Sequence, residues 1–446
     1  MGIDYKKRGF LLFGLFLIAS GIVLNQWTIG YLFRPVPRPI VEIKNLVIIW
    51  IFESVSIALG LCFIFLRKKL TETLLIVWFK NASAVIVAFL VGFVFMNVAL
   101  YAVSVVRASL GGINPVAEKY GVSPLSLYPG FTRAQYAELM KETWSRGFLY
   151  EPFTTIKEGP YHGTYVNVDE SGFRHVKNQE SWPLKKANFN IFIFGNSAVF
   201  NYGVPDEQTI ASYLQEFLQT GSGKNVAVYN FGRGFFYSSQ ERALYDKLLV
   251  SGNIPNVAVF IGGQTEFDVG TLGERPQFTQ DIESFFSGNT YSRILSSLPV
   301  VSWIKSFLAT KNTWSTSTIS YVPTEKDTTN INEAIQRFIA NKKLIEATSL
   351  AFGVQVFFVW QPIPSYEYNP DLDLFKKASI GPDASLGYPY MAKYVADHSM
   401  GNNFLYLADI QKGVKEPLYI DGLHYSGAWS REIALRIANF LKTKIF

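Results

Sequence analysis

The chain has 446 residues, of which 49% are hydrophobic and only 17% are charged, so it is more apolar than an ordinary soluble enzyme. The formal net charge is +6, but the Lys and Arg residues form no basic stripe and no nucleic-acid module, so nucleic-acid binding has no support. The single cysteine, Cys62, stands in an apolar run, which excludes an intramolecular disulfide and a thiolate zinc site.

Most of the apolar excess lies before about residue 107, where three segments have the composition of membrane-spanning helices. They cover about residues 10–32, 46–66 and 84–106. Each is close to the ~20 residues needed to cross a hydrocarbon core of about 30 Å. We therefore expect residues 1–107 to form a membrane anchor with three transmembrane helices.

Basic residues set the expected orientation of this anchor in the cell membrane. Those at its two expected cytoplasmic ends are Lys6, Lys7, Arg8, Arg67, Lys68, Lys69 and Lys80. Because positive charge favours the cytoplasmic side, the N-terminus is expected there and the C-terminal part in the periplasm or outside the cell. Three basic residues in the first loop weaken this bias. If the first segment were a cleaved signal peptide, the C-terminal part would still lie outside.

A carboxylate in the second span, Glu53, has two interpretations. Charged groups are costly in hydrocarbon and often mark a functional site. Glu53 lies less than two turns from the start of the span, so it can also reach the interface or a neighbouring helix, and we favour this interpretation. Three helices are too few for a transport path, so the segment is interpreted as an anchor.

Short apolar runs alternate with amphipathic stretches in the rest of the chain. The apolar runs, rich in β-branched and aromatic residues, are 191–194, 226–229, 257–261, 354–360 and 404–407. The amphipathic stretches are 208–219, 239–251, 332–350 and 429–442. Near-continuous apolar strands are typical of a parallel sheet covered on both faces. The alternation predicts a three-layer α/β fold with its active site at the carboxyl ends of the strands.

These patterns divide the rest of the chain into two regions. Residues 108–188 are expected to be a linker and lead-in, and residues 189–446 the α/β domain. Residues from about 270 to 329 are rich in Ser, Thr and aromatic side chains and lie between two predicted strands. A connection of this length in a compact domain is usually functional, so we expect an inserted cap or lid.

Three side chains have the chemistry of a nucleophilic site. Ser197 directly follows the first predicted strand, where a hydroxyl can be held exposed at the sheet edge. Asp421 and His424 stand three residues apart just before the last predicted helix. A serine needs an imidazole to remove its proton, and a carboxylate fixes the imidazole tautomer. Each motif alone is also typical of a helix N-cap or a turn, but together they predict a Ser-His-Asp triad.

Four blocks in order resemble those of the SGNH (GDSL-like) hydrolase superfamily. They are residues 194–204, Asn230-Phe231-Gly232, residues 260–267 and Asp421-Gly422-Leu423-His424. The segment 166–174 also resembles a lead-in of membrane-anchored members. A single block is a weak signal, but the ordered set in matching strand context is specific. The resemblance covers about residues 166–446.

The resemblance implies a flavodoxin-like SGNH-hydrolase domain in which Ser197 is the nucleophile and His424 and Asp421 complete the triad. It also implies that the backbone N–H groups of Ser197 and Gly232 stabilise the oxyanion. The third donor of the family is an Asn side chain, and here Thr265, or Gln264 in another alignment, takes its place. Because loss of one donor costs about 10²- to 10³-fold in rate, reduced activity is expected. Neither a metal nor a cofactor is expected.

The leading hypothesis is a membrane-anchored, extracytoplasmic serine esterase or O-acyltransferase. It would remove or transfer a small acyl group, with acetyl as the first candidate, on a carbohydrate or lipid-linked glycan. The resemblance to bacterial polysaccharide O-acetylation proteins implies that a transferase needs a many-helix membrane partner to supply the acyl donor.

The alternative hypothesis is a catalytically weak or inactive SGNH-fold subunit that serves as a scaffold or glycan-binding component of a membrane complex. The altered third block motivates it. The apolar segment 298–308 fits either hypothesis, as a lid, as a membrane-touching edge or as a helix that covers the core.

Overall fold

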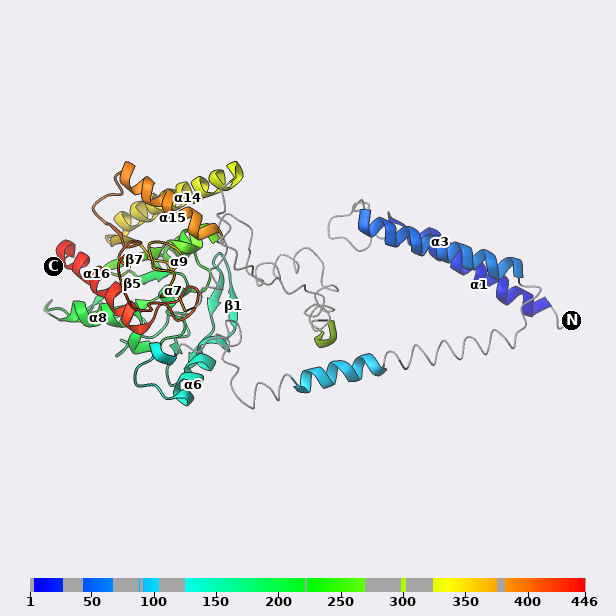
Figure 1. The fold of residues 1–446 in the computed structure, drawn as a ribbon, viewed down its shortest axis with the longest axis horizontal. Coiled ribbons are helices and arrows are strands. Elements are labelled where there is room, and N and C mark those ends of the chain that lie inside the picture. Colours follow the sequence, from blue (N-terminus) through cyan, green and yellow to red (C-terminus); the bar gives the residue numbers. More distant parts are fainter. Residues whose placement is uncertain are drawn as a thin grey trace. The chain divides into compact units, whose positions relative to one another are not determined.

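The computed structural model describes residues 4–26, 43–66, 88, 91–103, 125–220, 223–268, 298–301, 324–374 and 382–445. The chain divides into two compact units. The first comprises Met1–Val106 with Gln277–Asn312, and the second comprises Arg107–Pro276 with Thr313–Phe446. Figure 1 shows long helices in the first unit and a layered α/β arrangement in the second.

The first unit is built on two helices that pack along each other, α1 (Asp4–Val23) and α3 (Ile43–Leu66). Gly14 and Gly60 lie at their closest approach, where a Cβ on Gly60 would come 2.6 Å from the Gly14 carbonyl oxygen. Phe13 and Phe63 pack edge to face beside them, with ring centroids 5.2 Å apart. Small residues of this kind let two apolar helices approach closely.

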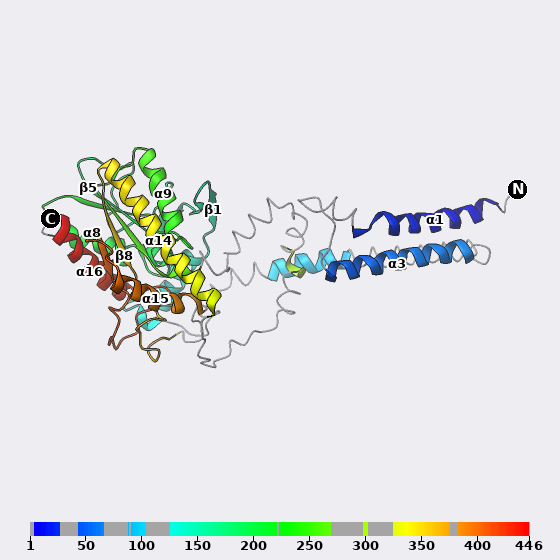
Figure 2. The ribbon, with the colours of Figure 1, turned by 90° about the horizontal axis from the view of Figure 1, so that it is seen from above.

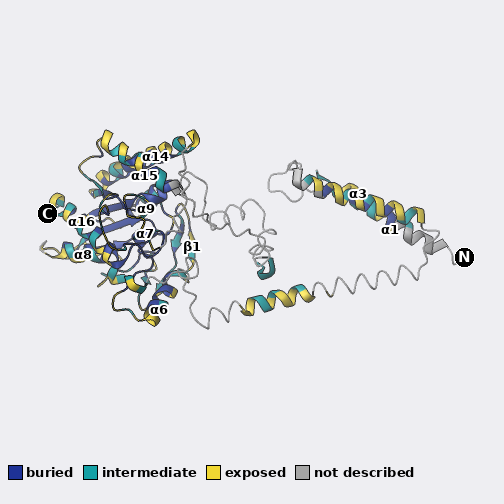
Figure 3. Ribbon diagram, in the orientation of Figure 1, coloured by how far each residue is buried: buried dark blue, intermediate teal, exposed yellow. Residues whose placement is uncertain are grey.

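One described helix is long and apolar enough to cross a membrane, over Ile49–Leu66. Phe13–Val23 and Val91–Val103 are apolar but shorter. Of the three predicted spans, only the second is therefore supported. The first is described up to residue 26 and the third over residues 88 and 91–103, and the apolar helices there are too short for a span, so three transmembrane helices are not confirmed. Many large apolar side chains of α3 are exposed, as Figure 3 shows, and a helix that faces lipid has such a surface.

A short part of the predicted cap belongs to the first unit. The backbone N–H of Val300 donates to Asn97 Oδ1 at 3.1 Å, so this part of segment 298–308 lies against the helical residues Val91–Val103. The three interpretations of that segment, as a lid, a membrane-touching edge or a helix that covers the core, stay predictions. The remainder of the predicted cap, apart from its last residues, lies outside the described residues.

The second unit contains a five-stranded parallel sheet in the order β6-β5-β7-β8-β9. The strands are β5 (Phe189–Gly195), β6 (Val226–Asn230), β7 (Val257–Gly262), β8 (Gln355–Trp360) and β9 (Phe404–Tyr406). All five predicted runs are strands, so the α/β fold with a parallel sheet is confirmed. This is the flavodoxin-like doubly wound order, in which the chain changes direction at the first strand and leaves a crevice beside its carboxyl end.

Helices cover both faces of this sheet, as Figures 1 and 2 show. On one face lie α8 (Ile210–Gln219) and α16 (Gly427–Ile445). On the other face lie α9 (Ser238–Val250), α14 (Glu325–Phe352) and α15 (Pro382–Asp397). The predicted helices are therefore present, and α14 begins earlier than the predicted residue 332.

Alternation along β5 explains the two layers of core. Ile191 and Ile193 pack into the cluster that contains α8 and α16. Phe192 and Phe194 point to the other face, where Phe194 stacks on Phe260 with ring centroids 4.7 Å apart. Because successive side chains of a strand point to opposite faces, both faces of this apolar strand are buried.

Residues 125–174 of the expected linker form a folded layer on the second unit. They contain α6 (Arg133–Trp144), the antiparallel pair β1 (Phe148–Glu151) and β2 (Thr155–Glu158), and the pair β3 (Tyr161–His162) and β4 (Asn167–Val168).

Buried Glu142 fixes this layer internally, because its carboxylate accepts three backbone N–H groups at 2.7–2.9 Å, from Thr164, Tyr165 and Val166. Residues 125–174 of the expected linker and lead-in therefore contain helices and strands of their own. Their short, half-exposed strands carry little hydrophobic periodicity, which is why the sequence did not predict them.

Candidate active site

A sharp turn at the end of β5 positions Ser197. Asn196 caps the short helix α7 (Ser197–Phe200), and its Oδ1 accepts the N–H of Ala198 at 2.9 Å. Gly195 leaves no room for a side chain, because a Cβ there would lie 2.5 Å from the carbonyl oxygen of Ile261 in β7. Ser197 therefore stands at the carboxyl edge of the sheet, beside the crevice expected for this strand order.

The three side chains predicted to form the triad lie together. His424 Nε2 is 2.9 Å from Ser197 Oγ, although 227 residues separate the two in sequence. His424 Nδ1 is 2.6 Å from Asp421 Oδ2. Hydroxyl, imidazole and carboxylate thus form one hydrogen-bonded series, and all three residues are buried.

Asp421 is held as an ionised acceptor. Its Oδ1 accepts the backbone N–H groups of Leu423 at 2.8 Å and His424 at 2.7 Å. Burial alone raises the pKa of this carboxyl, but His424 and the two N–H groups lower it below its ordinary value. A carboxylate with these bonds can fix the orientation of the imidazole and stabilise an imidazolium.

Two aromatic rings pack against the imidazole. Trp144, at the end of α6, and Tyr202, just after α7, have ring centroids 5.6 Å and 5.5 Å from that of His424. Trp144 belongs to the layer that the sequence analysis treated as a linker. No sequence motif indicated these contacts, because each joins a residue near the start of the second unit to one near its end.

The expected oxyanion donors are only partly available. Ser197 is the first residue of α7, so its N–H has no acceptor within the helix. The N–H of Gly232 donates to Asn230 Oδ1 at 2.9 Å. Gly232 is required for a different reason, since a Cβ there would lie 2.4 Å from the backbone nitrogen of Phe200. The Gly232 N–H is therefore used within its own loop in this structure, and its role as an oxyanion donor stays a prediction.

The loop after β6 contains another backbone amide that the sequence analysis did not single out. The N–H groups of Phe231, Arg233 and Gly234 donate to the Ile193 carbonyl, the Gly195 carbonyl and Glu158 Oε1. Within the described part of the chain, the N–H of Phe235 has no acceptor, and Phe235 has a positive φ of 65°. A bulky residue in this conformation is uncommon and is found preferentially at functional sites.

The third block contributes buried side chains beside β7. Thr265 Oγ1 accepts a hydrogen bond from Asn196 Nδ2 at 3.3 Å, which leaves the hydroxyl proton of Thr265 available as a donor. Gln264 begins α10 (Gln264–Asp268) and is also buried, and its Oε1 has no partner among the described residues. Thr265 is therefore the candidate that contacts the turn before Ser197.

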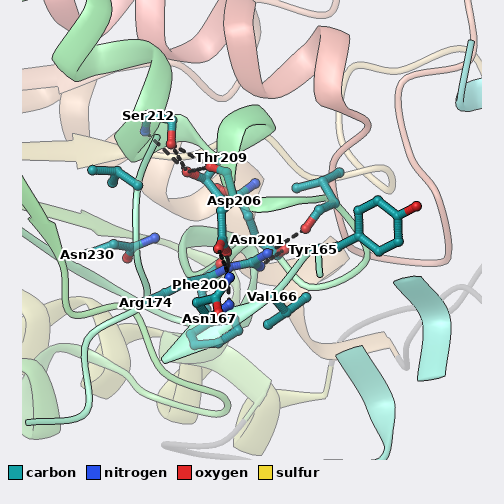
Figure 4. Close-up of polar contacts among 12 residues, drawn as sticks. Tyr165, Val166, Asn167, Arg174, Phe200, Asn201, Asp206, Thr209, Ser212 and Asn230 are labelled. Atoms are coloured by element: carbon teal, nitrogen blue, oxygen red, sulfur yellow. Dashed lines mark hydrogen bonds and ion pairs between the residues drawn. The ribbon is translucent and has the colours of Figure 1, made fainter. Parts of the chain in front are cut away.

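A buried arginine, Arg174, holds the chain around Phe200 and Asn201, as Figure 4 shows. Arg174 Nε pairs with Asp206 Oδ1 at 3.0 Å. Its two terminal nitrogens donate to three backbone carbonyls at 2.6–3.0 Å, those of Phe200, Asn201 and Val204. The guanidinium therefore fixes the turn that leaves α7. The lead-in motif at residues 166–174 contained Arg174, but its pattern did not reveal this contact.

The other histidines do not join the site. His175 stacks on Phe173 with ring centroids 5.8 Å apart, and burial lowers its pKa. His398 stacks on Tyr394 at 4.2 Å. Among the residues with described positions, no group of three or more His, Cys, Asp or Glu residues is placed to hold a metal ion.

No protein-family model matches the chain, and no curated protein matches it. Among solved structures it is similar to a lipase/acylhydrolase from Enterococcus faecalis, with 13% identity over 57% of this chain and 96% of that chain and a TM-score of 0.31. A GDSL-like lipase from Bacteroides thetaiotaomicron matches with 12% identity over 59% and 93% and a TM-score of 0.29. A catalytic mutant of an acetylxylan esterase from Geobacillus stearothermophilus matches with 12% identity over 59% and 98% and a TM-score of 0.31.

Proposed function

We propose that this protein is a membrane-anchored serine esterase or O-acyltransferase of the SGNH type. Its substrate would be a small acyl ester, with acetyl as the first candidate, on a carbohydrate or lipid-linked glycan outside the cytoplasm. The observation that carries the proposal is the series of contacts of 2.9 Å and 2.6 Å that joins Ser197, His424 and Asp421. This arrangement of hydroxyl, imidazole and carboxylate activates a serine for attack on an ester carbonyl.

The proposed reaction has two half-reactions. Ser197 Oγ attacks the ester carbonyl carbon while His424 Nε2 takes the hydroxyl proton, and the carbonyl oxygen becomes an oxyanion. His424 then gives the proton to the leaving alcohol oxygen, and the acyl group stays on Ser197. Water, or a sugar hydroxyl in a transferase, loses its proton to His424 and attacks the acyl carbon. The bond between the acyl carbon and Ser197 Oγ then breaks, His424 returns the proton to Oγ, and the acid or the acylated sugar leaves. Asp421 stabilises the imidazolium in both half-reactions.

Three groups are proposed to stabilise the oxyanion. The N–H of Ser197 and the hydroxyl of Thr265 are two of them, and the third is the N–H of Gly232, as the sequence predicts, or that of Phe235, which has no acceptor among the described residues. Preorganised donors of this kind are each worth about 10²- to 10³-fold in rate. A Thr hydroxyl is shorter than the Asn amide of the family, so the proposed enzyme is expected to be slow with simple esters.

Labelling with a fluorophosphonate probe tests the proposal without knowledge of the substrate, because the probe reacts with activated serines. The full chain in detergent is compared with Ser197→Ala and His424→Ala. Ser181→Ala is the matched control, since Ser181 is exposed and only its carbonyl oxygen is used, by Tyr229. Labelling of the wild type and the control, with loss in both triad variants, supports an enzyme.

A scaffold or glycan-binding subunit is the second candidate function. It is favoured by the committed N–H of Gly232 and by Thr265 in place of the family's Asn. A well-folded wild type that the probe does not label would support it, and the search would move to membrane proteins that co-purify with the chain. If Ser197 is labelled instead, a many-helix acyl-donor protein that co-purifies with the chain would support the transferase.

A further inference from the structure

A buried tyrosine and a buried carboxylate lie behind His424, and the proposed reaction does not use either. Tyr202 packs its ring on the imidazole, and its hydroxyl donates to Glu158 Oε1 at 2.5 Å. Tyr202 is 7% exposed and Glu158 is 2% exposed. Burial and the Glu158 carboxylate raise the pKa of Tyr202 well above its ordinary value, so the hydroxyl remains a donor.

Glu158 receives two further hydrogen bonds from different parts of the fold. Oε1 also accepts the backbone N–H of Gly234 at 3.2 Å, and Oε2 accepts from Arg146 Nη1 at 3.1 Å. The Arg146 guanidinium lies over the ring of Phe200, 4.8 Å from its centroid, and 5.8 Å from that of Tyr202. The Glu158 carboxylate therefore accepts hydrogen bonds from three parts of the fold. These are Tyr202 on the imidazole, the loop after β6 and Arg146 just after α6.

Glu158 bonds to the loop after β6, which contains the Phe235 N–H that has no acceptor among the described residues. Gly234 fits against Tyr202 and Phe148, because a Cβ on it would lie 2.9 Å from the Tyr202 hydroxyl oxygen and 2.8 Å from the Phe148 ring. The next residue is Phe235, whose N–H is free in the described structure. Fixing Gly234 therefore also restricts the position of the Phe235 amide.

Burying the Glu158 carboxylate in this space has a cost in free energy. Removing a charge from water costs several kcal/mol, which only good hydrogen bonds and an opposite charge offset. An apolar side chain would pack against Tyr202 without that cost, but it would hold neither the hydroxyl nor the loop amide. A Glu at this position is thus explained by the groups that it orients, the Tyr202 hydroxyl and the loop amide, rather than by packing.

We propose that Glu158 is a positioning residue for the triad: it holds Tyr202 against His424 and holds Gly234 in the loop after β6. This inference rests on the proposed esterase or acyltransferase function. It assigns a kinetic role to β2, which lies in the segment between the anchor and the sheet, and it makes Tyr202 the contact through which Glu158 acts on the imidazole.

The test uses p-nitrophenyl acetate hydrolysis by the full chain in detergent, with kcat and KM measured separately. Tyr202→Phe keeps the ring but removes the hydroxyl, and Glu158→Ala removes the carboxylate. Both are expected to lower kcat by about 10- to 100-fold, because a misplacement of about 1 Å can cost 10²-fold, while KM stays within about twofold. Glu158→Gln still accepts through its amide oxygen, so it should recover most of kcat.

Glu142→Gln is the matched control. Glu142 is 2% exposed and accepts three backbone N–H groups from residues 164–166, so it is as buried and as fully bonded as Glu158. It touches neither Tyr202 nor the loop after β6. Its replacement should lower the melting temperature but leave kcat within about threefold of the wild type, the range of a purely structural loss.

The outcomes separate this inference from the proposed function. An active wild type whose kcat is unchanged in Tyr202→Phe and Glu158→Ala overturns the inference alone. A raised KM with unchanged kcat also overturns it, since the lost interaction would then be one with substrate. A wild type with no Ser197-dependent hydrolysis and no probe labelling overturns the proposed function and the inference together. If Glu158→Ala does not fold, Tyr202→Phe decides.

Discussion

Replacing Arg174 by methionine removes the group that holds the turn after α7 while keeping a side chain of similar length. The change leaves Asp206 with its bonds from the Asn167 backbone N–H and Asn167 Nδ2 but without a guanidinium. Three carbonyls also lose their donors. Breaking a buried ion pair on one side costs about 3–5 kcal/mol. Because Asp206 is slightly exposed and some carbonyls can find water, we take ~4 kcal/mol.

The assay is thermal unfolding of the full chain at pH 7, followed by tryptophan fluorescence. For a unit of roughly 250 residues, 1 kcal/mol shifts the melting temperature by about 2–4 °C, so Arg174→Met is expected to lower it by about 8–16 °C. Arg174→Lys keeps the charge but cannot reach all four acceptors, so about half that shift is expected. The same variants should label more slowly with the probe, since the turn that they release follows Ser197 directly.

Arg436→Met is the control for this prediction. Arg436 pairs with Glu432 at 2.8 Å on the exposed side of α16, and such a pair contributes less than about 0.5 kcal/mol. A melting temperature for Arg174→Met that equals that of Arg436→Met would refute the reasoning. It would mean that the buried guanidinium does no more for the fold than a surface one.

Three more predictions follow from the described contacts. Asp421→Asn should lower kcat for p-nitrophenyl acetate by about 10⁴-fold without loss of fold, because the amide no longer fixes the required imidazole tautomer; retained kcat would exclude the triad. Burial, and then Glu266, raises the pKa of Glu241. Above the carboxyl pKa of the unfolded chain, the folded chain therefore keeps a proton that the unfolded chain has lost. Wild-type stability falls as pH rises from the unfolded pKa of this carboxyl towards the folded one. Glu241→Gln should therefore melt higher than the wild type at pH 7 and equal to it at pH 4; an equal difference at both pH values would contradict the assignment. Gly60→Leu should separate α1 from α3. It should therefore abolish disulfide crosslinking between cysteines placed at positions 13 and 63 in a Cys62→Ser background. Gly92→Leu is the control and should leave the crosslink intact, because nothing lies within 4 Å of a new Cβ there.

The layers of the second unit were predictable because its strands are buried on both faces. An apolar run such as residues 191–194 has no polar face, so it predicts a buried strand whichever face each side chain points to. The start of α14 was missed because its first turns are polar, and Thr324 begins it with a capping box to Asp327. A capping box without an apolar run is a weak signal from sequence alone.

The sequence predicted the residues whose side-chain chemistry a triad requires. It did not predict the contacts that are made through the backbone. Ser197, Asp421 and His424 are the side chains that a triad requires, and their order along the chain indicated one. Gly232 was assigned by its position in a block, and the bond of its N–H to Asn230 lies within that block, since an Asn side chain commonly accepts the N–H two residues further on. Arg174 acts through the backbone of residues 200–204, so its partners have no side-chain identity to recognise.

The folded layer at residues 125–174 changes what a minimal active fragment would be. A soluble version begun at residue 189, where the sheet starts, would lack Trp144 on the imidazole, Glu158 beneath Tyr202 and Arg174 on the nucleophile turn. Such a fragment would expose apolar surface around the triad and would be expected to lose the serine's reactivity along with its fold. A fragment that keeps the folded second unit therefore has to begin before residue 125.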